Sequence, residues 1–265
     1  MSTIAFTPEQ NLPVSDLLKL RRRRGLVVVT SLLTVVAMAL TYGIIELVHL
    51  ASPATHGPAG GVENLGHGSW VAATLGAVAA AIVGSIAGAG DLEAGIYRDL
   101  VVTGRSRLAL YRSRLVGGLL FLLPFVAAGY ALTAIATVAF AGSRPVPGAH
   151  LLLTTGLWVL LQAAFYYLIA FGTACLIGSR SYTIGILLGF RLALTPILAS
   201  ISALGVLREL VPGVAIQALA PAALGDTVRQ GPVVPMSVAA IALVLLAWAL
   251  LVVAAGAWRD VSRDA

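Results

Sequence analysis

The charged side chain in the least expected place in this 265-residue sequence is Arg191. It lies about nine residues into an apolar run that begins near Tyr182, roughly 14 Å along a helix that rises 1.5 Å per residue. A charged residue in such surroundings normally faces a cavity or a polar partner. Polar residues at a similar depth in the preceding apolar run are Tyr166, Tyr167 and Gln162. We expect Arg191 either to line a pathway or a subunit interface, or to tie helices together through these side chains.

Other residues that can do chemistry are few and poorly spaced. The segment from about Leu50 to Ser69 contains His56, Glu63 and His67. No pair of histidines at i, i+4 and no tight ligand spacing occurs there, so solvated histidines are favoured over a metal site. The single cysteine, Cys175, lies in an apolar run and makes neither a disulfide within the chain nor a cysteine zinc site.

The composition restricts the class of protein. Apolar residues make up 59% of the chain and charged residues 11%, whereas a soluble domain carries roughly 25% charged residues. This excludes a soluble enzyme, a disordered chain and a nucleic-acid-binding domain. The net charge of +6 then fits a few basic loops on a lipid-embedded chain.

Six segments are long enough to span a membrane, which needs about 20 mostly apolar residues. The sequence therefore predicts an all-α polytopic membrane protein with spans at about 25–49, 70–90, 115–141, 150–177, 182–204 and 236–258. Each helix closes its own backbone hydrogen bonds, as hydrocarbon demands. Small residues at Gly84 and Gly88, and at Gly185 and Gly189, have the spacing of close helix packing.

The basic residues predict the orientation. Thirteen of the 17 lysines and arginines lie before the first span, between the second and third spans, at the fourth–fifth turn or in the tail, and three lie in the opposite loops. The positive-inside rule then predicts that both termini lie in the cytoplasm. We expect the protein to reside in the cell membrane.

Residues 1–24 predict a cytoplasmic interfacial helix ahead of the six-span transmembrane region 25–265. Val14, Leu17 and Leu18 share one helical face, and Asp16 and Lys19 point elsewhere. Such a helix, followed by four arginines, suits the headgroup layer. A disordered basic anchor is the alternative.

The segment 205–235 lies between the fifth and sixth spans on the predicted outer side. Val206–Leu210 and Val214–Leu224 are apolar but too short to span, and Pro212 and Pro221 interrupt them. Runs of this length favour re-entrant or interfacial short helices. They either close an outer gate or merely cover the helix ends.

The inner loop 91–114 carries eight charges, yet its apolar residues recur at helical spacing at Leu92, Ile96, Leu100 and Val101. We expect a short helix with an apolar face, a break at Thr103-Gly104, and a second helical stretch leading into the third span. An apolar face on this side favours a protein partner or the membrane surface.

Here the sequence resembles a known family. The pattern Glu93-x-Gly95, Arg98 and Thr103-Gly104-x-Ser106-Arg107 is similar to the inner loop of the type-2 permeases of ATP-binding-cassette exporters. Ile96 stands where that family commonly has Thr. Gly104 stands where Pro or Gly occurs. The six spans, the interfacial helix, the long outer segment and the ending Trp258-Arg259-Asp260 match the family layout over nearly the whole chain.

The resemblance implies a dimer of six-span subunits, most simply a homodimer, above two separate nucleotide-binding ATPase subunits. The coupling residues would be Asp91, Leu92, Glu93, Gly95, Ile96, Arg98 and Arg107. The chain has no Gly-x-x-x-x-Gly-Lys-Ser/Thr loop, and its single lysine, Lys19, follows no glycine-rich loop, so ATP and Mg²⁺ belong to the partner and the chain itself is not an enzyme. The pathway would export a hydrophobic or amphipathic substrate, with membrane lipids around it and no nucleic acid bound. Independently of the resemblance, we expect the pathway or a polar contact between helices to include Arg191, Tyr166, Tyr167 and Gln162.

Two alternatives to this exporter subunit remain. A secondary transporter or channel would work without an ATPase, but such proteins typically carry several ionisable groups or broken helices at mid-membrane. An intramembrane enzyme lacks the histidine and aspartate that a Ser-His pair or a metal site would need inside the spans.

Overall fold

The computed structural model describes residues 12–102, 104–228 and 234–263, and this part of the chain is helical and contains no strand. Six helical runs are long and apolar enough to cross a membrane: Arg24–Ala51, Val62–Glu93, Arg107–Ala139, Ala149–Ile177, Arg180–Ser200 and Val238–Ser262. The predicted helical class and the number of spans are therefore confirmed, and the chain has the make-up of a multi-pass membrane protein.

Four spans are continuous and two are interrupted. The continuous ones are α4 (Val62–Glu93), α6 (Arg107–Ala139), α7 (Ala149–Ile177) and α11 (Val238–Ser262). The first span consists of α2 (Arg24–Ser31), the π-helix η1 (Leu32–Val36) and α3 (Ala37–Ala51). The fifth consists of α8 (Arg180–Gly189), the π-helix η2 (Phe190–Leu194) and α9 (Thr195–Ser200). Both interruptions widen the helix by one residue per turn without ending it.

Several bounds differ from those that the sequence predicted. The second span begins at Val62 rather than Trp70, and the third begins at Arg107 rather than Leu115. Apolar composition marks only the part of a helix that lies in hydrocarbon, whereas helical hydrogen bonding continues through polar residues beyond it. The predicted loop 91–114 is shortened to the segment 94–106 between α4 and α6 for this reason.

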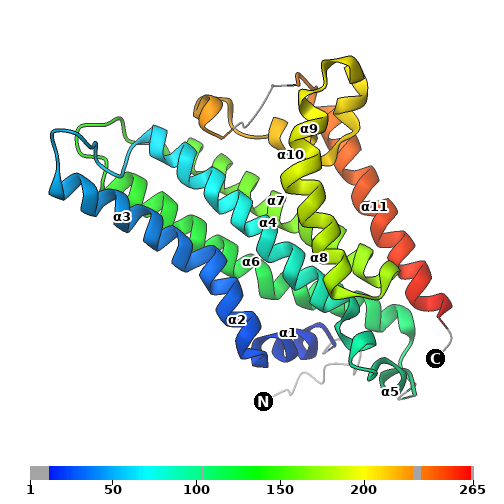
Figure 1. Ribbon diagram of the computed structural model, residues 1–265. Coiled ribbons are helices and arrows are strands. Elements are labelled where there is room, and N and C mark those ends of the chain that lie inside the picture. Colours follow the sequence, from blue (N-terminus) through cyan, green and yellow to red (C-terminus); the bar gives the residue numbers. More distant parts are fainter. Residues whose placement is uncertain (1–11, 103, 229–233, 264–265) are drawn as a thin grey trace, which may run out of the picture.

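The centre of the molecule is the pair α4 and α7, which lie side by side (Figure 1). A Cβ atom on Gly84 would lie 2.8 Å from the Tyr167 carbonyl oxygen, and one on Gly88 would lie 2.6 Å from that of Phe171. Only glycine allows the two backbones to approach this closely. The first predicted small-residue motif is thus a packing motif.

The second predicted motif does not pack against the part of the chain that the structure describes. A Cβ on Gly185 or Gly189 would meet no atom within 4 Å. The span Arg180–Ser200 leans away from the central pair toward its far end, as Figure 1 shows for α8 and α9. Among the described residues, this span is one of the least buried of the six.

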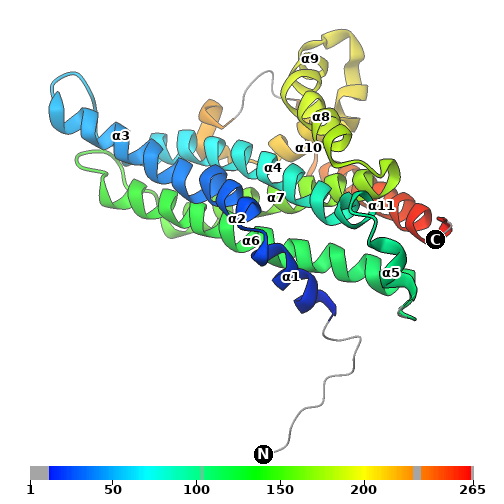
Figure 2. The ribbon, with the colours of Figure 1, turned by 60° about the horizontal axis from the view of Figure 1, so that its bottom comes forward.

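The helix α1 (Leu12–Arg22) lies at one end of the bundle at an angle to α2 (Figure 1), and Figure 2 shows it beside α6. It packs tightly on α6, because a Cβ on Gly117 would lie 2.8 Å from Cβ of Asp16. Val14 and Leu18 point outward and are half exposed, while Asp16 and Lys19 reach into the bundle. The predicted helix exists over the described residues; Leu12 and Leu20 are buried and Leu17 packs on the core, while Asp16 and Lys19 add polar inward contacts. The remainder of the predicted segment, 1–11, lies outside the described residues.

The segment after the fifth span forms the short helices η3 (Ser202–Leu210), α10 (Pro212–Ala218) and η4 (Ala222–Thr227). Residues 212–216 of α10 are buried, and the Trp158 indole N–H donates to the Ile216 carbonyl at 2.9 Å. The apolar residues Val206 and Leu207 of η3 remain exposed. Short helices were predicted here; residues 229–233 of the predicted segment lie outside the described part.

Candidate functional site

A buried ion pair joins three spans at the end of the bundle that carries α1, α5 (Tyr97–Val102) and the end of α11, which we call the α5 end (Figure 1). Arg114 of α6 lies 2.5 Å from the Asp260 carboxylate of α11, and the two side chains are 5% and 0% exposed. Arg114 also donates to the Gly88 carbonyl of α4 at 3.1 Å. Both charges are almost fully removed from water, so separating them would leave each one buried without a counter-charge. The pair is therefore held in one geometry.

The short helix α5 is attached to this pair. The Tyr97 hydroxyl donates to the Asp260 carboxylate at 3.0 Å, and the Arg114 guanidinium lies over the Tyr97 ring, 5.4 Å from its centroid. Burial, with the neighbouring Asp260 carboxylate second, raises the pKa of Tyr97 to about 12, so the hydroxyl keeps its proton at neutral pH. Tyr97 therefore fixes α5 to the ends of both α6 and α11.

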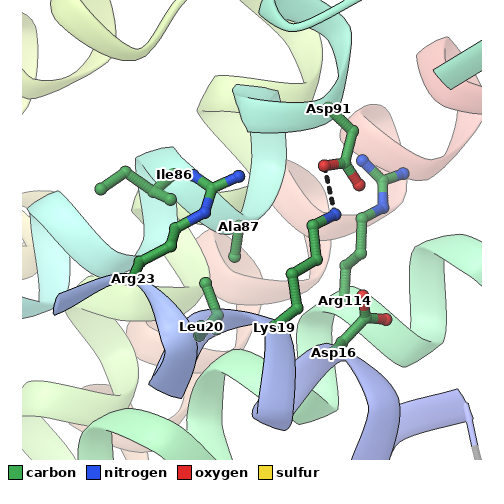
Figure 3. Close-up of a pocket in the computed structure, with 8 residues that line it drawn as sticks. All are labelled: Asp16, Lys19, Leu20, Arg23, Ile86, Ala87, Asp91 and Arg114. Carbon is green, nitrogen blue, oxygen red and sulfur yellow. Dashed lines mark hydrogen bonds and ion pairs between the residues drawn. The ribbon is translucent and has the colours of Figure 1, made fainter. Parts of the chain in front are cut away.

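The second set of polar contacts at this end comes from α1 (Figure 3). Lys19 forms an ion pair with Asp91 of α4, and the Ser113 hydroxyl of α6 donates to Asp16. Burial raises the pKa of the Asp16 carboxyl, and the hydrogen bond from Ser113 opposes that rise. The space between these residues and Arg114 is only about 10 Å³, which is too small for a ligand. These contacts fasten α1 to the bundle.

A third ion pair closes the α5 end on another side. Glu93, the last residue of α4, accepts from both the side chain and the backbone N–H of Arg180, at the start of α8. The Arg107 guanidinium donates to the carbonyl oxygens of Val261 and Arg263 near the end of the chain. The second, third, fifth and sixth spans each have a residue in one of these contacts, so polar side chains tie the α5 ends of four spans together.

The predicted coupling residues now have positions. Asp91 is buried against Lys19, Leu92 is half-buried, and Glu93 and Arg107 make the contacts above. Gly95 forms a left-handed turn (φ +72°) ahead of α5, and Arg98 lies in α5 with its side chain outside the described part. The break predicted at Thr103-Gly104 falls after α5, where Gly104 has φ +81°; Thr103 lies outside the described residues.

The surface that α5 and its flanks present is apolar in two places. Ile96 is 39% exposed and Val102 is 78% exposed. Tyr97, between them, points inward to Asp260. The sequence predicted a short helix with Leu92 and Leu100 on the same face as Ile96, but α5 begins only at Tyr97, because the turn at Gly95 separates it from α4.

The Arg191 region lies elsewhere, in η2 near the middle of the fifth span. Its guanidinium lies 5.5 Å from the centroid of the Tyr166 ring, so the contact is with the face of the ring and not with the tyrosine hydroxyl. The other two predicted residues face away: the Tyr167 hydroxyl donates to the Leu115 carbonyl of α6 at 3.0 Å, and Gln162 donates to the Ala73 carbonyl of α4 at 2.9 Å. Tyr167 and Gln162 are therefore ties between helices.

A cavity of about 80 Å³ adjoins Arg191. It lies between α4, the fifth span and α10, and its wall includes Trp70, Thr74, Thr195 and Gln217. Nε of Arg191 is buried and has no hydrogen-bond partner in the described part of the chain. Among the described residues, no group of three histidines, cysteines or carboxylates could hold a metal ion.

The sequence did not single out Arg114, Asp260 or Tyr97 as site residues. Arg114 was used only as one of the basic residues that predict the orientation, and Asp260 only as part of the ending that resembles the family. In the sequence, Arg114 and Asp260 are a basic and an acidic residue that each lie within a turn or two of an apolar run. They are 146 positions apart, and no local pattern reveals that they pair. No protein-family model and no curated protein matches this chain, so its function has to be inferred from its own residues.

Proposed function

We propose that this chain is the membrane-spanning subunit of an ATP-driven exporter, coupled to separate nucleotide-binding subunits at the α5 end. The observation that carries the proposal is the attachment of α5. An exposed short helix with apolar flanks is anchored through one tyrosine to the buried ends of α6 and α11. A partner that moves α5 thereby moves two spans, which is what an ATPase-driven transporter requires.

The charge distribution supports the same assignment. Arg105, Arg107 and Arg112 lie at the α5 end, together with α1 and its run of arginines (Figure 1). By the positive-inside rule this end lies in the cytoplasm, and both termini lie there with it. The protein then resides in the cell membrane with α5 facing the compartment that supplies ATP and Mg²⁺.

The dimer and the direction of transport come from the family resemblance. Two copies of the six spans would form the pathway, which exports a hydrophobic or amphipathic substrate. The coupling residues of the proposal are those of α5 and the turns on either side of it, with Ile96 and Val102 as the exposed apolar contacts. Arg191 and Tyr166 belong to the pathway, and no ATP is bound by this chain.

The test is co-purification in a mild detergent with untagged products of neighbouring genes, followed by an ATPase assay. Val102→Glu places a charge on the proposed docking surface, and Val146→Glu makes the same change at a 57% exposed residue in the loop 140–148 at the opposite end. We expect a stoichiometric ATPase partner that is lost from Val102→Glu and kept by Val146→Glu.

One observation favours the alternative of a secondary transporter, namely the arginine and cavity near mid-membrane. That alternative predicts that the purified chain transports in liposomes with no ATPase present. A chain that purifies alone and transports alone would replace the exporter proposal.

A further inference from the structure

The cavity beside Arg191 has a charge that the described residues do not balance. Its guanidinium forms no ion pair and no hydrogen bond with them, and its polar neighbour is the face of the Tyr166 ring. Glu46, the acidic residue of the first span, is engaged elsewhere, since it accepts from the backbone N–H of Ala59 at 3.0 Å. A guanidinium has five N–H donors and no acceptor, so what completes this site must bring acceptors and negative charge.

A second orphaned polar group lies on the same wall. The Thr74 hydroxyl of α4 is buried without a hydrogen-bond partner in the described part of the chain, and it lines the cavity that Arg191 lines. A planar guanidinium and a nearby hydroxyl together match an oxyanion, because carboxylates and phosphates accept two parallel N–H bonds and have lone pairs to spare.

The backbone is shaped around this position. Arg191 lies in the π-helix η2, and π-bulges in membrane and soluble helices are frequent at functional sites. The backbone N–H and the hydroxyl of Thr195 both donate to the Phe190 carbonyl, the hydroxyl at 2.9 Å, so the widened turn keeps its hydrogen bonding. The interruption is thereby stable, and it holds Arg191 beside α4.

The remaining walls of the cavity and its volume indicate the size of the ligand and where its apolar part would lie. Leu192, Pro196 and Ala199 line it together with Trp70. Its volume of about 80 Å³ holds a head group but no long chain. Leu192 and the neighbouring face of the fifth span are exposed, so an apolar chain attached to the head group would extend along that face.

We propose that this cavity binds the oxyanion head group, a carboxylate or a phosphate, of a single-chain amphipathic molecule, with Arg191 as its counter-charge. As an assignment of the transported substrate, this rests on the exporter function proposed above; as a binding site, it is tested without the ATPase. Trp70 borders the head group, Thr74 supplies a neutral donor, and the Tyr166 ring lies against the Arg191 guanidinium.

The experiment is isothermal titration calorimetry of the purified full-length chain in a non-ionic detergent. The probes are octanoate, octyl phosphate, octanol and inorganic phosphate. We expect octanoate or octyl phosphate to bind at least about tenfold more tightly than octanol and inorganic phosphate, since a hydrogen bond to a charged group contributes more than one between neutral groups. Equal binding of octanol would overturn the oxyanion assignment, and equal binding of inorganic phosphate would overturn the amphipathic one.

Variants locate the site. Arg191→Gln should lose the preference for the anionic probes, and Arg191→Lys should keep it. The matched control is Arg21→Gln, which removes the same charge from the edge of another apolar cavity, of about 490 Å³, near α1. If Arg21→Gln abolishes the preference and Arg191→Gln does not, the site is at the α1 cavity and the proposal is wrong. If Arg191→Gln does not fold, the comparison of the four probes on the unaltered chain still decides whether the protein binds an amphipathic oxyanion.

The two proposals fail in different ways. The absence of an ATPase partner, with octanoate bound through Arg191, would remove the exporter and keep the site. An ATPase partner that depends on Val102, with no anion preference, would remove the site and keep the exporter. Dissociation of a dimer by Arg191→Gln with unchanged probe binding would make Arg191 a subunit contact and overturn the site as well.

Discussion

Two arginines in the spans of this protein differ in whether neighbouring residues balance their charge. Arg114 has a carboxylate, a backbone carbonyl and an aromatic ring around it, and 5% of its side chain is exposed. Arg191 has an aromatic ring and, within the described residues, nothing of opposite charge. An arginine that only stabilises a fold is compensated by the fold itself. The comparison therefore separates a structural charge from one that is left for a ligand.

The largest effect is expected from breaking the compensated pair. Asp260→Asn leaves Arg114 buried with no counter-charge, and removing one partner of a buried pair costs about 3–5 kcal/mol. Thermal unfolding in detergent should show a large drop in Tm. The double variant Arg114→Met, Asp260→Leu should recover most of the loss, since it leaves no isolated charge. A single variant as stable as the unaltered protein would show that the pair does not hold the α5 end.

The packing should be tighter around Arg114 than around Arg191. Gly88 accepts from Arg114, and a Cβ there would lie 2.6 Å from the Phe171 carbonyl, so Gly88→Ala should cost about 1–3 kcal/mol through overpacking. Gly189, two residues before Arg191, has no atom in the way of a Cβ. Gly189→Ala should therefore leave Tm unchanged or raise it. Equal losses in both variants would mean that another surface packs on Gly189.

The uncompensated arginine should matter for transport more than for folding. We expect Arg191→Ala to lower ATP-driven transport in liposomes at least about tenfold, equivalent to about 1.4 kcal/mol. Its free energy of unfolding should change by less than about 1 kcal/mol, because no partner charge is stranded by the change. The readouts are transport rate and Tm on the same preparation. Normal transport with intact assembly would contradict the assignment.

The smallest effect is a pH dependence at α1. The pKa of Asp16 is raised by burial above its ordinary value of 3.8, so the folded state binds this proton more tightly than the unfolded state. Its stabilising contribution is present below pH 3.8 and is lost as the pH rises through the folded pKa. Asp16→Asn should remove this loss and flatten the difference in stability between acidic and neutral pH. A variant with the same pH profile as the unaltered chain would show that Asp16 is not buried in solution.

How much of this was predictable depends on the range of the interaction. The six spans follow from local composition, and Arg191 with Tyr166 was found because both depth and residue type can be counted along a helix. The pairing of Arg114 with Asp260 joins positions 146 apart, and helical periodicity carries no information at that distance. The pairing of Lys19 in α1 with Asp91 in α4 was not predicted either, because the two residues are far apart in the sequence.

The two glycine turns around α5 have a mechanical consequence. Gly95 and Gly104 both have positive φ, and an added Cβ on either would meet no atom of the described residues within 4 Å, so the turns on each side of α5 are not packed against the bundle at these glycines. Torque on α5 is then transmitted poorly along the chain and well through the Tyr97 hydroxyl, which reaches a carboxylate 163 positions away. A load on this short helix then reaches the last span, and α6 at Arg114, through the Tyr97 side chain rather than along the backbone.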